Sequence, residues 1–78
     1  MPLLRVFGPA RDAAGTAGEQ FPGADVGAVL DAACERYGPG FADVLRRSAV
    51  WLNGEPATRA HAVGDDDEVA VLPPVSGG

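Results

Sequence analysis

The last residues of the sequence are the clearest candidates for chemistry, because they read Leu-Pro-Pro-Val-Ser-Gly-Gly and finish with the carboxylate of Gly78. A chain end made of Gly77 and Gly78 fits a channel too narrow for any side chain, and its backbone can be gripped directly. Six residues reach at most about 20 Å when extended. We therefore expect residues 73–78 to form a flexible tail that carries this carboxylate into a pocket of another protein. The alternative is an ordinary frayed terminus, which is common in domains.

The other residue types that commonly do chemistry are scarce. The single cysteine, Cys34, can neither form an internal disulfide nor alone hold zinc or an iron-sulfur cluster, and free cysteines are mostly packed as small apolar residues. The single histidine, His61, has no neighbours in the sequence that suggest a triad or a metal site. We expect this chain to bind no metal and no cofactor.

The composition limits the classes of partner. Eleven acidic residues face six arginines and no lysine, for a net charge of −5, which disfavours nucleic acid and favours a basic protein partner. The acidic run at 65–68 is either a solvated turn or an electrostatic contact to such a partner. No apolar stretch is long enough to span a membrane and no leader is recognisable, so we expect a cytoplasmic protein without a membrane partner.

The first third of the chain predicts a β-hairpin. Residues 3–7 are apolar and favour a strand, which Gly8 and Pro9 close. Residues 10–18 read as a turn-rich connection, after which residues 19–21 can return as a second strand.

A helix over residues 26–37 is the best-defined element. Asp25 is a suitable N-cap, and Gly38 followed by Pro39 ends the helix. Its apolar residues recur at helical spacing on one stripe, at Val26, Val29, Leu30, Ala33 and Tyr37. A second short helix is expected over 41–47, too brief to be stable without tertiary support.

Three more strands are expected in the second half of the chain. They cover residues 49–53, 57–59 and 68–72, and the last is cut off by prolines that supply no N–H groups. A hairpin followed by a helix and further strands predicts an α+β domain over residues 1–72, with one face of the sheet packed on the helix.

The alternation of residues along the strands predicts an apolar patch on the face of the sheet that points away from the helix. Phe7, Trp51 and Leu72, which we call the anchor residues, should point away from the helix, beside Ala70 and Arg5. An open patch of this kind usually marks a docking surface. The alternatives are that loops cover part of it or that one strand is assigned one residue out of register.

Four stretches taken together identify a family resemblance. They are RVFGPARDAAG, VGAVLDAACERYG, VWLNGE and GDDDEVAVLPPVSGG. On these residues the chain resembles the MoaD family of small sulfur carriers, the small subunits of molybdopterin synthase, along essentially all of its 78 positions. The resemblance implies a ubiquitin-like β-grasp fold, with a mixed sheet of four or five strands packed on one main helix plus a short helix.

The resemblance also implies a mechanism. The carboxylate of Gly78 would be adenylated by a MoeB-like, ubiquitin-activating-like adenylyltransferase that uses ATP, and a sulfur donor protein would convert it to a thiocarboxylate. An ionised thiocarboxylate is a soft nucleophile, the form that sulfur needs to attack carbon. The attack would take place in a MoaE-like large subunit of the synthase, on a pterin precursor. The carrier would supply the reacting group, and the catalytic groups would belong to its partner.

The implied site therefore has two parts. Gly78 and Gly77 form the reacting end, and the partner-binding residues are Phe7, Trp51, Leu72, Pro73, Pro74, Val75 and Ser76. Two alternatives stay open: the same chemistry in another pathway, such as thiamine thiazole, cysteine or specialised-metabolite synthesis, or a non-covalent ubiquitin-like interaction module whose end is never activated.

Overall fold

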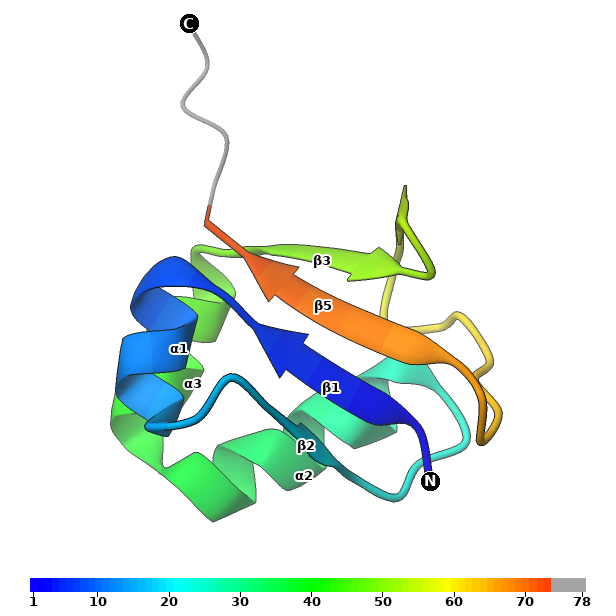
Figure 1. Ribbon diagram of the computed structural model, residues 1–78, viewed down its shortest axis with the longest axis horizontal. Coiled ribbons are helices and arrows are strands. Elements are labelled where there is room, and N and C mark those ends of the chain that lie inside the picture. The colour runs from blue at the N-terminus through cyan, green and yellow to red at the C-terminus, as the bar shows by residue number, and fades with distance from the viewer. Residues whose placement is uncertain (74–78) are drawn as a thin grey trace, which may run out of the picture.

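Five strands form one mixed sheet in the order β2-β1-β5-β3-β4 (Figure 1). The computed structural model describes residues 1–73 of the chain. The strands are β1 (Leu3–Val6), β2 (Gly18–Gln20), β3 (Ala49–Leu52), β4 (Glu55–Pro56) and β5 (Glu68–Leu72). β1 and β5 are parallel neighbours, whereas β2 pairs with β1, β3 with β5, and β4 with β3 in antiparallel fashion. The mixed sheet expected from the sequence is confirmed.

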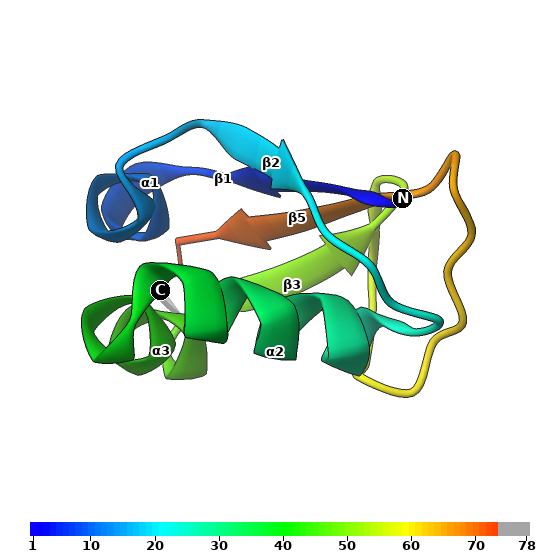
Figure 2. The same cartoon turned by 90° about the horizontal axis from the view of Figure 1, so that it is seen from below.

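Three helices complete this part of the chain: α1 (Gly8–Ala14), α2 (Val26–Tyr37) and α3 (Pro39–Arg46). α2 and α3 lie on the same side of the sheet, and α1 packs against α3 (Figure 2). α2 has the predicted bounds, because the carboxylate of Asp25 accepts a hydrogen bond of 2.8 Å from the N–H of Ala28 and caps the first turn. Gly38 ends α2 and Pro39 then begins α3.

α1 corrects the prediction of a turn-rich connection over residues 10–18. Gly8 has a positive φ of 57° that turns the chain out of β1, and Pro9 then stands at the start of the helix, where its fixed φ is favourable. The alanines that follow are good helix formers, and Ala10 is buried against the core. The signal for this helix was a proline in the first turn, Pro9, with alanines after it.

The other boundaries shift by a few residues, and the largest change concerns the short edge strand. It is β4, Glu55–Pro56, and not residues 57–59. Asn53 and Gly54 both have positive φ, 49° and 86°, as a two-residue hairpin turn requires, so the chain reverses at once and Glu55 pairs with Leu52.

The core lies between the sheet and the helices. The alternation that turns the anchor residues outward predicts that Leu4, Val6, Val50, Leu52, Val69 and Val71 face the helix. Four of them are fully buried, and Val50 and Leu52 are partly buried against the core, which confirms this inward face. Against them lies the helix stripe, of which Val26, Val29, Leu30 and Ala33 are buried. The largest fully buried side chain is that of Phe41 in α3, whose ring meets that of Tyr37 edge-on at a centroid distance of 5.1 Å.

A substitution at Gly8 tests how Pro73, which follows β5, is held in place. A Cβ built at Gly8 would lie 2.8 Å from Cγ of Pro73, and the left-handed backbone there is strained for any other residue. We expect Gly8→Ala to lower the free energy of unfolding by about 1 to 2 kcal/mol from the backbone alone and to displace Pro73. Urea denaturation followed by circular dichroism measures the loss.

Gly40→Ala is the matched control for this substitution. Gly40 lies within α3 at an ordinary backbone angle with no atom near its Cβ position, so alanine should raise stability by about 0.5 to 1 kcal/mol. Equal effects of the two substitutions would show that neither the left-handed backbone at Gly8 nor its contact with Pro73 matters.

Candidate functional site

The outer face of the sheet carries the residues that the alternation predicted there. The strand register places Arg5 beside Ala70 and Ala70 beside Trp51, with Pro56 next in the same row. The neighbours of Trp51 and Ala70 along their strands, Val50 and Val71, pair with each other on the core side. The predicted parity is therefore confirmed in β1, β3 and β5.

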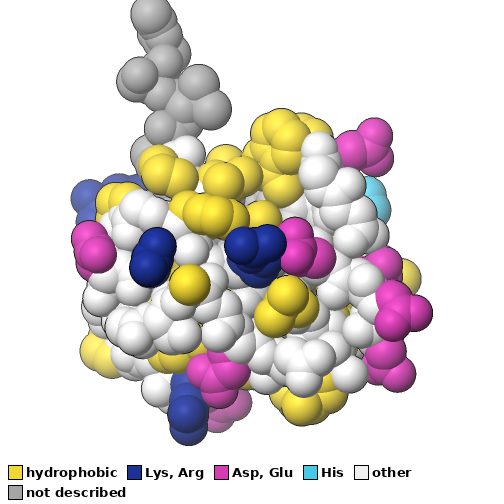
Figure 3. All heavy atoms as spheres, viewed as in Figure 1, with side chains coloured by type: hydrophobic (Ala, Val, Ile, Leu, Met, Phe, Trp, Pro, Cys, Tyr) yellow, Lys and Arg dark blue, Asp and Glu magenta, His cyan; other side chains and the backbone are white. Residues whose placement is uncertain are grey.

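Of the three anchor residues, Phe7 is the most exposed. Its side chain is 36% accessible, and the guanidinium carbon of Arg5 lies 5.7 Å from the centre of its ring. Trp51 and Leu72 are half-buried, so the expectation of an exposed tryptophan holds only in part. Trp51 keeps a partly open face because its outer neighbour is only the two-residue strand β4. Figure 3 shows hydrophobic side chains gathered over β3 and at the end of β5, with charged side chains beside them.

The root of the predicted tail is fixed by neighbours on two sides. Leu72, the last residue of β5, pairs with Ala49, the first residue of β3. Pro73 is exposed and contacts Gly8 at the start of α1. The other predicted site residues lie outside the described residues: Pro74, Val75, Ser76, Gly77 and Gly78.

The acidic run lies at the opposite end of β5 from Pro73. The last residue of the run, Glu68, begins β5, and Pro73 lies five residues further on, about 16 Å away at the usual rise of a strand. The carboxylate of Asp67 accepts hydrogen bonds from the N–H of Gly64 and from the amide of Asn53, and these bonds lower the pKa of Asp67. Asp65 pairs with the N-terminal amine at 3.1 Å. These contacts favour a structural turn, and a contact with a basic partner stays a prediction.

Cys34 and His61 have structural surroundings. Cys34 is half-buried against the core, and burial, together with the nearby carboxylate of Asp31, raises the pKa of its thiol, so the reactive thiolate is disfavoured. Nδ1 of His61 accepts a hydrogen bond from the N–H of Thr58 at 2.9 Å, and its carbonyl accepts one from Val26 at the start of α2. His61 thus holds its loop on α2, a role that its position in the sequence did not indicate.

Two negative findings concern residues 1–73. No three of the His, Cys, Asp and Glu side chains in this part of the chain are placed so that they could hold a metal ion. No helix among these residues combines the length and the apolar character that crossing a membrane requires.

A groove that was not expected from the sequence lies between α1 and α3. It is lined by Pro9 from α1, Val44 from α3, and Arg47 and Ser48 from the segment that leads into β3. Its volume is about 200 Å³. Because residues 10–18 were predicted as a turn, no surface between two helices was expected here.

Known structures share this fold over almost the whole chain. The small archaeal modifier protein 1 from Haloferax volcanii is 30% identical, with 99% of this chain and 98% of that chain covered and a TM-score of 0.80. A chain in the complex of subunits 1 and 2 of the molybdopterin-converting factor from Helicobacter pylori is 26% identical, with coverages of 99% and 97% and a TM-score of 0.70. A chain of the Amycolatopsis orientalis BexX/CysO complex is 22% identical, with complete coverage of both chains and a TM-score of 0.81, and that match concerns the fold alone.

These neighbours confirm the ubiquitin-like β-grasp fold that the resemblance implied. The match to the family model described as "ThiS family" spans residues 4–78. It covers the strands and helices described above and continues through the Gly-Gly end. The chain therefore belongs to the ThiS family, the ThiS- and MoaD-like sulfur carriers with a ubiquitin-like fold.

Proposed function

We propose that this chain carries sulfur on the carboxylate of Gly78, which is first adenylated and then converted to a thiocarboxylate. The observation that carries the proposal is the family match through residue 78, because it includes the tail as well as the folded domain. The confirmed outer face of the sheet supports it, since it offers a surface for an activating protein close to Pro73.

The chemistry follows from the reactivity of a carboxylate. It is a poor electrophile until one oxygen becomes part of a good leaving group, and the mixed anhydride with AMP provides that leaving group. One carboxylate oxygen attacks the α-phosphate of ATP and pyrophosphate leaves. The outer sulfur of a persulfide on a sulfur donor protein then displaces AMP at the acyl carbon and gives an acyl disulfide. A thiol attacks the donor's sulfur and breaks the S–S bond, so that a disulfide forms on the donor and the ionised, nucleophilic thiocarboxylate is released. In this proposal the reaction takes place in the cytoplasm, where ATP is available.

The activating and accepting proteins would supply the catalytic groups. Small carriers of the ThiS and MoaD type are not catalytic in themselves. In the proposal this chain provides the reacting group, while a MoeB-like adenylyltransferase binds the ATP. Phe7, Trp51 and Leu72 would dock on that partner, and the energy of docking would offset the roughly 1 to 2 kcal/mol that ordering each tail residue costs.

The acceptor we favour is a pterin precursor in the large subunit of molybdopterin synthase. Its support is the similarity to the Helicobacter chain, which was solved in complex with its subunit 2. The archaeal relative, a modifier by name, has a slightly higher identity of 30%. The second candidate is therefore transfer of the same activated Gly78 to an amine of another protein.

Intact-mass spectrometry tests the proposal. The purified chain is incubated with ATP and with the adenylyltransferase and sulfur donor of its own organism. We expect a mass gain of about 16 Da, the difference between sulfur and oxygen, located in the C-terminal peptide. An unchanged mass under conditions in which the partners are active would favour the non-covalent interaction module. Formation of molybdopterin on adding the large subunit would identify the acceptor.

A further inference from the structure

The groove between α1 and α3 adjoins the root of the tail. Arg47 and Ser48 in its wall directly precede Ala49, which pairs with Leu72 across the sheet. On the other wall, Pro9 follows Gly8, whose Cβ position would lie 2.8 Å from the ring of Pro73. Two independent contacts therefore place this groove beside Leu72 and Pro73, to which the predicted tail is attached. A protein that takes up the tail must pass close to it.

The size and lining of the groove suit a side chain better than a small molecule. Its volume of about 200 Å³ is below the roughly 300 to 1,000 Å³ of small-molecule sites. The ring of Pro9, the side chain of Val44 and the aliphatic stem of Arg47 make the wall mainly apolar. The hydroxyl of Ser48 already donates to the carbonyl of Val44 at 2.8 Å, so it is engaged within the wall.

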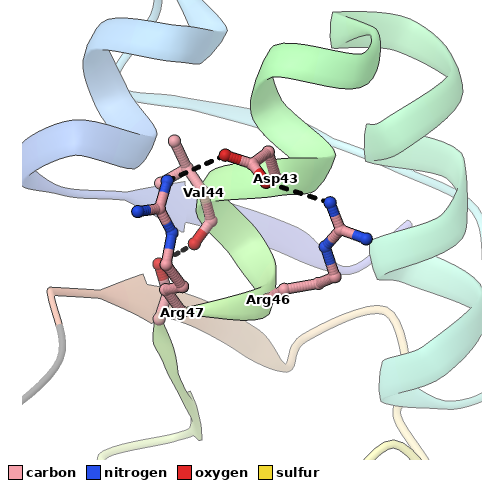
Figure 4. Close-up of polar contacts among 5 residues, drawn as sticks. Asp43, Val44, Arg46 and Arg47 are labelled. Carbon is pink, nitrogen blue, oxygen red and sulfur yellow. Dashed lines mark hydrogen bonds and ion pairs between the residues drawn. The ribbon is translucent and has the colours of Figure 1, made fainter.

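The charged side chain in the lining of the groove is that of Arg47, although the chain as a whole has a net charge of −5. Arg46 and Arg47 donate to the two oxygens of one carboxylate, that of Asp43, at 2.9 and 2.8 Å (Figure 4). Two guanidinium groups thus share a single negative charge. Within residues 1–73, the guanidinium of Arg47 has a hydrogen-bond partner only at Nη2, and its side chain is 71% exposed. Its other donors face solvent and suit a carboxylate.

We propose that this groove receives an aliphatic side chain flanked by an aspartate or glutamate, presented by the enzyme that adenylates the tail. The inference rests on the proposed function, because it takes that enzyme as the partner. The groove is then a second contact beside the outer face of the sheet. It would hold the root of the tail in place while the end of the chain is activated, and its charge would repel partners whose matching surface is basic.

Steady-state adenylation kinetics with the adenylyltransferase of the same organism test this inference. We expect Arg47→Glu, which reverses the charge in the lining, and Val44→Asp, which puts a carboxylate into the apolar wall, each to raise KM for the carrier by about 10-fold. The kcat should stay within about 2-fold, because neither residue takes part in the chemistry of the tail. Arg47 is exposed, so its variant is expected to fold even if Val44→Asp is destabilised.

Arg36→Glu is the matched control. Arg36 is an arginine of similar exposure, 65%, and also forms an ion pair, with Glu19 on the edge strand β2. Its reversal should leave KM within about 2-fold of the wild-type value. An equal rise in KM for Arg36→Glu would overturn the groove and indicate a general effect of charge. An unchanged KM in both groove variants would also overturn the groove contact, but it would leave the proposed function intact. Failure of the wild-type chain to be adenylated at all would overturn both proposals.

Discussion

Deletion of Gly78 abolishes the uptake of sulfur and leaves the domain folded. In the shortened chain the carboxylate belongs to Gly77 and lies about 3.5 Å short of its former reach. A displacement of that size removes the reacting carbon from the attack geometry on which activation depends. Intact mass after incubation with ATP, the adenylyltransferase and the sulfur donor should show no gain of 16 Da. The thermal melting curve should match that of the full chain, because β5 ends at Leu72.

Ser76→Ala is the control for this deletion, since it keeps the length of the tail and both glycines. It should still gain about 16 Da, even at a lower rate, because the carboxylate of Gly78 keeps its full reach. Sulfur uptake by the shortened chain would contradict the mechanism. A gain of about 32 Da, which a persulfide on a thiol produces, would then point to Cys34.

Replacement of Trp51 by alanine weakens binding of the adenylyltransferase by roughly 30-fold or more, the effect of losing a contact worth about 2 kcal/mol. The indole lies on the outer face of β3, between Ala70 and the short edge strand, so a partner can cover it without any rearrangement of the core. Isothermal titration calorimetry measures the affinity. Circular dichroism establishes that the variant is folded.

Leu52→Ala separates binding from stability. Leu52 is the next residue of β3 and packs against the core on the other face of the sheet. Its truncation should lower the free energy of unfolding by about 2 kcal/mol and leave the affinity of the folded protein within about 2-fold. If the Trp51→Ala variant binds the adenylyltransferase with the wild-type affinity, Trp51 is not part of the interface.

Local signals in the sequence predict much of this fold. α2 follows from its capping residue and apolar stripe, and the two faces of the sheet follow from alternation, because both patterns depend on residues only a few positions apart. α1 was missed because Gly8 and Pro9 were read as the end of a strand, although the proline also begins a helix. β4 was misplaced because the turn at Asn53 and Gly54 is tighter than expected.

The candidate site likewise has parts that the sequence indicates and parts that it does not. The outward positions of the anchor residues can be read from the sequence, since they depend on strand parity. The tail stays a prediction, because residues 74–78 lie outside the described residues. The groove beside Pro73 cannot be read from the sequence, because it arises where α1 meets α3 and so depends on tertiary packing. The role of His61 depends likewise on a loop folding back onto the start of α2.

The position of β5 also determines how the molecule bears mechanical load. β5 is bonded along its length to β1 on one side and β3 on the other (Figure 1), and Pro73 follows its last residue. A force applied at Pro73 along the strand acts across these hydrogen bonds and loads both ladders together in shear. A force that peels the strand away from one end would instead break the hydrogen bonds one after another, at lower force. A partner can therefore pull on the end of this protein, or withdraw from it, without unravelling the domain.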